Sequence, residues 1–383
     1  MKKKRKASFS PDGEKAGMRG MKTRRRSPHP NPLPVRGEGK LKAWFLVKIY
    51  FLILFGIFLV AILLLAFPSF LPVSQTVGVS FSAPQATAIG LDWKKTYIAI
   101  LDDLQVRHLR LSAYWDSLQP SSQDAYNFSD LDYQINEAQK RDAHVVLSIG
   151  RKLPRWPECH IPVWAQGLSE KEQQQDVLAM LAVVVDRYKN NPALDMWQLE
   201  NEPLLTFGIC PKADTNFLTQ EQSVVRAHDT SHHILITDSG ELNSWLGAAQ
   251  YGDELGTTMY RTVFSNRLKS LFRYDYIFPA WAYRVKAHYI YLLFHKQVII
   301  SELQGEPWGV KPYNEMTNEE RSQSFSPARF VQLRLFAQRT QLQQVYWWGA
   351  EYWYCEKTVN HNDAYWEVAK QLFSSKGGGI YGK

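Results

Sequence analysis

The sequence predicts an α/β protein: a (β/α)8, or TIM, barrel preceded by a single N-terminal transmembrane helix. Eight β-rich runs alternate with helix-like stretches, and nineteen uncharged residues, 49–67, come before them. Among the 383 residues 45% are hydrophobic and 21% are charged, so the chain can bury a large core. This composition excludes a mainly disordered, collagen-like or coiled-coil protein.

The positive charge is concentrated at the N-terminus. Residues 1–42 hold 14 Lys and Arg against three acidic residues, a balance of +11 in a chain whose formal net charge is +8. The other 341 residues therefore carry a net charge of −3 and lack the basic face that nucleic-acid binding needs. We expect no nucleic-acid partner, and we expect residues 1–42 to form a basic, disordered cytoplasmic tail.

Residues 43–67 are expected to anchor the chain in a lipid bilayer. At about 1.5 Å per residue, the run from Ile49 to Phe67 can cross a hydrocarbon core of about 30 Å, and it is apolar on all sides. A cleaved signal peptide is the alternative, but the run is longer than is usual for one and no A-x-A pattern follows it. The basic N-terminal flank predicts a single-pass protein of the cell membrane, with its N-terminus in the cytoplasm and its later residues outside.

After a linker at residues 68–76, residues 77–373 are expected to form the barrel, and residues 374–383 a C-terminal tail. Stretches such as 172–191 and 327–340 have apolar residues at three- and four-residue spacing, as helices do. The β-rich runs begin near Val77, His108, His144, Leu194, His233, Gly256, Gln297 and Val345. The sixth run, GTTMYRTV, is also compatible with a helix. Strand and helix alternating eight times predict a closed parallel sheet.

Two glutamates stand where apolar runs end, which in this fold is the catalytic face. Glu202 follows the fourth run and Glu302 the seventh, so we expect both in the barrel mouth, flanking one bond. Retaining glycoside hydrolysis needs two such carboxyl groups, a protonated acid and an ionised nucleophile. Arg110, near the end of the second run, is a candidate cation beside the nucleophile. Glu306 is an alternative partner for Glu202, and we expect Glu200 to be a structural hydrogen-bonding residue.

The triplet Asn201-Glu202-Pro203 resembles the motif that ends strand four in the clan of retaining (β/α)8 glycoside hydrolases, which includes cellulase-like, mannanase and β-galactosidase families. The similarity extends from about Val77 to Phe373. It implies that Glu202 is the acid/base, that Asn201 binds the sugar 2-hydroxyl, and that Glu302 is the nucleophile.

The same resemblance implies roles for further residues of the mouth. Arg110 would orient the nucleophile, Tyr260 would contact it, and Trp348 would floor the subsite of the reacting sugar, with Trp347 as a competitor for that place. Two positions depart from the pattern of cellulase-like members. The places where those members often carry a His, after strand three and two residues before the tyrosine, read SIGRK and Thr258 here.

Aromatic residues crowd the predicted mouth loops and offer faces on which sugars can stack. Among them we expect Trp115 and Trp308 to bind substrate. Cys159 and Cys210 lie in the loops after strands three and four, where they could form a disulfide outside the membrane and leave Cys355 unpaired.

Other chemistries have little support in the sequence. There is no H-E-x-x-H motif, no Cys pair at zinc spacing, no G-x-S-x-G elbow, no P-loop and no dinucleotide fingerprint. We therefore expect no metal and no cofactor. The sequence predicts a membrane-anchored retaining glycoside hydrolase acting on oligo- or polysaccharide. The alternatives are a non-catalytic carbohydrate-binding barrel and a transglycosylase of the same fold.

Overall fold

The computed structural model describes residues 38–66, 71–265, 270–275, 277–309, 311 and 315–374. The predicted tail up to residue 37, linker residues 68–70 and residues 375–383 lie outside this part of the chain. Helix α1 (Glu38–Ala66) begins five residues before the predicted span. Within it, Trp44–Leu64 is long and apolar enough to cross a membrane, by length and composition.

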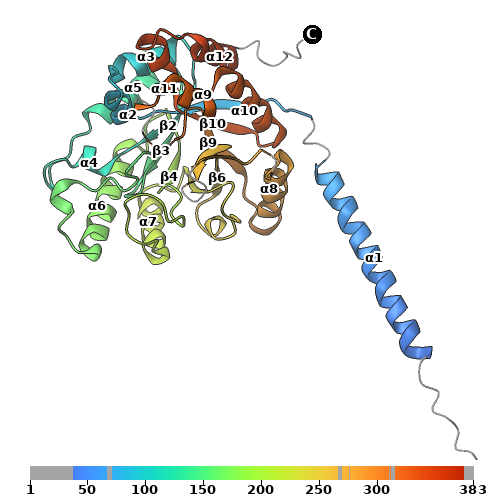
Figure 1. The fold of residues 1–383 in the computed structure, drawn as a ribbon. Helices are drawn as coiled ribbons and strands as arrows, with labels where there is room; N and C mark the ends of the chain where they lie inside the picture. Colours follow the sequence, from blue (N-terminus) through green and yellow to red (C-terminus); the bar gives the residue numbers. More distant parts are fainter. Residues whose placement is uncertain are drawn as a thin grey trace, which may run out of the picture. The chain divides into compact units, whose positions relative to one another are not determined.

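Eight parallel strands form a closed barrel, in the order β1-β10-β9-β6-β5-β4-β3-β2 (Figure 1). This confirms the predicted fold class. The barrel strands are β1 (Thr76–Ser80), β2 (His108–Ser112), β3 (His144–Ile149), β4 (Leu194–Leu199), β5 (His233–Asp238), β6 (Glu254–Met259), β9 (Val298–Gln304) and β10 (Gln344–Trp348). The sixth predicted run is split: its first half is β6, and its second half enters an antiparallel hairpin of β7 (Thr262–Ser265) and β8 (Ser270–Arg273).

Helices connect the strands and lie around the barrel (Figure 1). They are α2 (Ala83–Ala88), α3 (Trp93–Asp102), α4 (Trp115–Leu118), α5 (Ser129–Gln139), α6 (Glu170–Tyr188), α7 (Thr215–His228), α8 (Ala280–Phe294), α9 (Asn318–Ser324), α10 (Pro327–Arg339), α11 (Ala350–Thr358) and α12 (Ala364–Phe373). The longest of them, α6, starts at a capping box in which Ser169 and Glu172 satisfy each other's free backbone N–H groups. Its buried residues include Val177, Leu181 and Val184, at the three- and four-residue spacing of one helix face.

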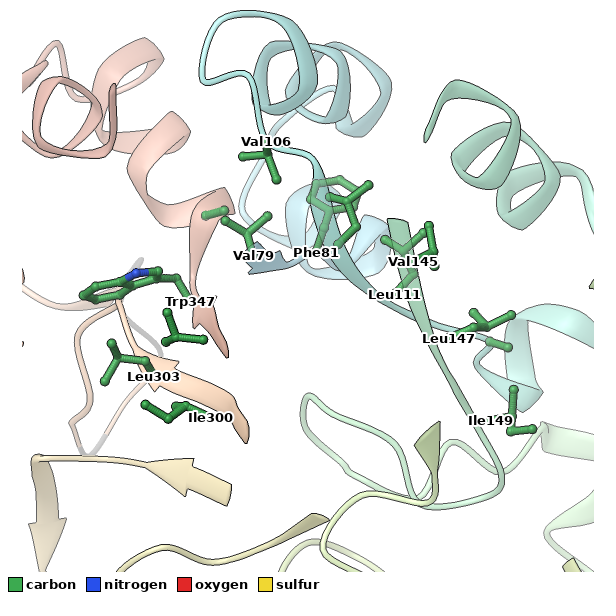
Figure 2. Packing of buried hydrophobic residues seen from close by; sticks show 14 of the residues in the cluster. Val79, Phe81, Val106, Leu111, Val145, Leu147, Ile149, Ile300, Leu303 and Trp347 are labelled. Atoms are coloured by element: carbon green, nitrogen blue, oxygen red, sulfur yellow. The ribbon is translucent and has the colours of Figure 1, made fainter. Parts of the chain in front are cut away.

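Apolar side chains fill two separate regions of the barrel domain. The larger cluster lies between strands and helices, and Figure 2 shows part of it, including Val145, Leu147 and Ile300. A smaller cluster of Val146, Met196, Leu235, Ile299 and Tyr346 alternates with it along the strands, so these residues point into the barrel. The barrel interior is therefore packed below the mouth.

Candidate active site

Glu202 and Glu302 are brought to the mouth by two different local structures. Glu202 follows β4 in a turn where its φ is +44°, and its backbone N–H donates to Thr237 Oγ1 at 2.8 Å. Glu302 lies within β9. The pairing of β9 with both neighbours shifts at Ser301, which is an extra residue in this strand. Such a bulge redirects side chains next to active sites, and here it accompanies the inward orientation of Glu302 toward Arg110.

Glu302 is held by two donors on opposite oxygens. Arg110 forms a buried ion pair with Oε1 at 2.8 Å, and the Tyr260 hydroxyl donates to Oε2 at 2.7 Å. Arg110 also donates to Gln198 at 2.6 Å and to Asn201 Oδ1 at 3.0 Å, so its guanidinium is fixed in place. This arrangement matches a carboxylate that carries its negative charge in a buried site.

Glu202 has a different environment. Its Oε1 accepts a hydrogen bond from Thr258 Oγ1 at 2.8 Å, and Thr258 is the direct strand neighbour of Glu302. The two carboxyl groups therefore share one small region of the mouth. Burial and the charge of Glu302 raise the pKa of Glu202 to about 8. The raised pKa favours the protonated form of Glu202.

Sequence reasoning missed two residues of this group. Thr258 was noted only as a departure from the family pattern, yet its hydroxyl contacts Glu202. Glu158, in the loop after β3, accepts a hydrogen bond from Asn201 Nδ2 at 3.1 Å, and burial and the charge of Glu302 raise the pKa of Glu158 to about 8. The adjacent Cys159 gave a signal, because a disulfide to Cys210 would bring this loop against the one after β4.

That disulfide is present, with a Cα–Cα distance of 5.3 Å, and Cys355 is buried and unpaired. Glu200 has the structural role expected of it. Its two oxygens accept the backbone N–H groups of Arg151 and Lys152 at 2.7 and 2.6 Å. These bonds join the loops after β3 and β4 beneath the candidate catalytic residues.

Trp348 and Glu306 form a second group at the mouth. The Trp348 indole N–H donates to Glu306 at 2.8 Å, and the Arg155 guanidinium lies 3.9 Å from the Trp348 ring centroid. Arg155 also pairs with Glu306 at 2.5 Å. Glu306, the alternative nucleophile, is therefore engaged with Arg155 rather than with Arg110. Trp347, the competitor of Trp348, packs in the core against Phe330.

The two other predicted aromatic contacts have different outcomes. Trp308 packs edge-on against Tyr260, with ring centroids 5.0 Å apart, and adjoins Phe207. It therefore lies beside the tyrosine that donates to the candidate nucleophile. Trp115 is fully buried, donates to Gln119 at 2.6 Å and packs against Trp164. The prediction that Trp115 binds substrate is corrected: it is a core residue at the start of α4.

Within the part of the chain that the structure describes, no group of three or more His, Cys, Asp or Glu side chains is arranged to hold a metal ion. The site brings together a buried carboxyl group whose pKa is raised, a carboxyl group paired with Arg110, and aromatic faces. Such an arrangement can transfer a proton and form a bond to an electrophilic carbon.

Comparisons with known proteins agree with this fold. A model of the cellulase family, described as glycosyl hydrolase family 5, matches residues 75–271. The chain is similar to a probable mannan endo-1,4-beta-mannosidase A-1 of Aspergillus terreus, with 26% identity over 117 residues, which cover 29% of this chain and 30% of that protein.

Solved structures with the same fold include the cold-adapted beta-galactosidase from Rahnella sp. R3 and a protein named GH5_18 from Streptomyces cattleya in complex with GlcNAc. The first has a TM-score of 0.55 at 13% identity and covers 78% of this chain and 55% of its own. The second has a TM-score of 0.50 at 12% identity and covers 72% of this chain and 71% of its own. The matches therefore span about a third of the mannosidase and about half of the galactosidase.

Proposed function

Because the chain belongs to the cellulase family, glycosyl hydrolase family 5, we propose that it is a retaining glycoside hydrolase. Its substrate would be an oligo- or polysaccharide with β-linked O-glycosidic bonds. Glu302 would be the nucleophile and Glu202 the acid/base. Asn201, Arg110, Tyr260, Trp348 and Trp308 would bind the sugar or orient the nucleophile.

The reaction proceeds by double displacement. A Glu302 oxygen attacks the anomeric carbon while the bond to the leaving oxygen breaks, and Glu202 gives its proton to that oxygen. The product of this step is a glycosyl ester of Glu302, and Glu202 is now a carboxylate. Glu202 then takes a proton from a water molecule, whose oxygen attacks the anomeric carbon and frees Glu302.

The observation that carries the proposal is the contrast between the two carboxyl groups. The pKa of Glu202 is raised to about 8, so the group holds the proton that the first step needs. Glu302 accepts from Arg110 and Tyr260, which stabilise a negative charge on it. A pure binding protein would have no need for a proton donor beside an Arg-paired carboxylate.

We also propose that α1 anchors the enzyme in the cell membrane, with the basic N-terminus in the cytoplasm and the barrel outside. The exposed, apolar segment Trp44–Leu64 supports this, as does the charge excess before it. Protease added to intact cells should then digest the barrel. Protection of the barrel until the cells are lysed would contradict this orientation.

A trapping experiment tests the proposed chemistry. The detergent-solubilised full chain is incubated with activated 2-deoxy-2-fluoro β-glycosides of glucose, mannose and galactose, and its peptides are examined by mass spectrometry. We include mannose because part of the sequence is similar to that of a probable mannosidase. We expect one added fluoroglycosyl group on the peptide that contains Glu302, and none in the Glu302→Gln variant.

Other outcomes of this experiment identify the alternatives. An adduct on Glu306 would assign the nucleophile to that residue instead. Sugar binding without an adduct or turnover would indicate a carbohydrate-binding barrel. Turnover that yields longer oligosaccharides would indicate a transglycosylase.

A further inference from the structure

Glu158 is a buried carboxyl group in the mouth with no part in the two displacement steps. It is 7% exposed and lies in the loop after β3, next to Cys159, whose disulfide partner is in the loop after β4. A backbone hydrogen bond from Ile209 to Pro157 at 2.9 Å joins the same two loops. The φ of Glu158 is +73°, a conformation that non-glycine residues seldom adopt. The surrounding loops thus fix where this carboxyl group lies.

Its hydrogen bond goes to Asn201, the neighbour of the acid/base. Asn201 Nδ2 donates to Glu158 Oε2 at 3.1 Å, while Asn201 Oδ1 accepts from Arg110 at 3.0 Å. The amide has its donor side toward Glu158 and its acceptor side toward the guanidinium. Glu158 and Arg110 together therefore determine which way the Asn201 side chain is oriented.

We propose that Glu158 is a positioning residue of the hydrolysis, which orients Asn201 and adds a third, ionisable carboxyl group to the Glu202 and Glu302 pair. The inference rests on the proposed function. Its basis is the position of Glu158, since a buried carboxyl group bonded to Asn201 affects the site through that hydrogen bond and through its electrostatic interaction with Glu302. In its neutral form it keeps one oxygen for Asn201 and has a proton to donate from the other.

The charged groups around Glu158 determine when it is neutral. Glu302 on β9 repels a negative charge there, whereas Lys152 after β3 and Arg110 on β2 attract one. Burial is the largest influence, and together with Glu302 it raises the pKa of Glu158 to about 8. A negative charge on Glu158 would in turn raise the pKa of Glu202. Glu158 and Glu202 therefore lose their protons in a coupled way, which sets the alkaline limit of activity.

Two substitutions separate the hydrogen bond from the charge. Glu158→Gln keeps an acceptor for Asn201 and cannot ionise, so we expect kcat near pH 6 to stay within about threefold of the wild type, because the bond is retained. Its alkaline limb should move to lower pH, because the charge that raises the pKa of Glu202 is gone. Glu158→Ala loses the bond as well, and we expect kcat to fall about tenfold with a smaller change in KM.

Thermal unfolding gives a readout that needs no activity. In the folded protein the pKa of Glu158 is raised from an ordinary value of 4.5, so its stabilising contribution is complete below that value and is lost as the pH rises toward 8. The Tm of Glu158→Gln, relative to that of the full-length wild type, should therefore be higher at pH 8 than at pH 5. Glu367→Gln, which removes an exposed carboxyl group on α12 that pairs only with a lysine within the described chain, is the control.

The outcomes are distinguishable. If the wild type turns over glycosides while both Glu158 variants keep its kcat and its pH profile, the role of Glu158 is refuted and the proposed function stands. If the Tm difference between Glu158→Gln and the wild type is the same at pH 5 and pH 8, the raised pKa of Glu158 is refuted. A wild type without turnover or covalent trapping refutes the proposed function itself.

Discussion

The barrel interior contains two layers of very different chemistry, only two residues apart along the strands. The apolar layer includes Val146, Met196 and Leu235, whereas Ser148, Gln198 and Thr237 follow them at the next inward positions. Arg110, Glu202 and Glu302 join this second, polar layer at the mouth. The apolar layer stabilises the fold by burying hydrocarbon, while the polar layer buries ionisable groups at a cost in stability. We infer that stability and chemistry are separated along each strand, so that each can be changed alone.

Removal of the nucleophile should have the largest effect on activity. Glu302→Gln keeps the shape of the side chain but cannot form the glycosyl ester, so kcat should fall by at least about 10⁴-fold. Steady-state rates on an aryl β-glycoside measure this. Folding should persist, as judged by circular dichroism, because the substitution leaves the apolar layer untouched. A variant with wild-type turnover would show that Glu302 is not the nucleophile.

Removal of the acid/base should have the next largest effect. Glu202→Gln should lower kcat by about 10² to 10⁴-fold on substrates with poor leaving groups, and less on those that need no protonation. The wild-type rate should decline above pH 8, where Glu202 loses its proton, and this limb should be missing in the variant.

The same variant also tests the energetic cost of the polar layer. Because the pKa of Glu202 is raised in the folded state, its stabilising contribution is present below its ordinary value of 4.5 and is lost as the pH rises toward 8. Glu202→Gln should therefore unfold at a higher temperature than the wild type at pH 8, with a smaller difference at pH 5. Equal destabilisation at both pH values would contradict this account.

The sequence was sufficient to predict the barrel and the position of two glutamates at its mouth, because both depend on local patterns, while the catalytic roles of the glutamates stay a prediction. Alternating apolar runs predict the strands, and Glu202 and Glu302 stand out as acidic residues at their ends. The sequence failed where contacts depend on how loops meet. Cys159, next to Glu158, indicates which loop Glu158 faces, but nothing in the chain indicates its hydrogen bond to Asn201. Nothing local distinguishes buried Trp115 from the mouth residue Trp308. The bulge at Ser301 was also invisible, because it exists only in the pairing of β9 with its neighbours.

A change in the apolar layer should lower stability and leave turnover unchanged, whereas changes in the polar layer should lower turnover. Leu235 is fully buried in the inward-facing cluster, and Leu235→Ala would leave a cavity there. We expect the free energy of unfolding to fall by about 2 to 5 kcal/mol, as measured by denaturant titration. At a temperature where the variant is folded, kcat should stay close to the wild-type value. A loss of turnover comparable to that of Glu202→Gln would show that the two layers are coupled.

The smallest change in free energy is expected on substitution of Thr258, which bonds Glu202 and is the strand neighbour of Glu302. Thr258→Val keeps the shape of the side chain and removes the hydroxyl that donates to Glu202 at 2.8 Å. That hydrogen bond lowers the pKa of Glu202, so its loss should move the alkaline limb to higher pH, the opposite direction to Glu158→Gln. A bond of this kind contributes about 1 kcal/mol, so kcat at neutral pH should fall about fivefold.

Thr219→Val on the exposed face of α7 is the control, because the hydroxyl of Thr219 bonds only within its own helix turn in the described structure. If Thr258→Val and Glu158→Gln move the alkaline limb in the same direction, the two residues do not act on Glu202 through opposite electrostatic effects.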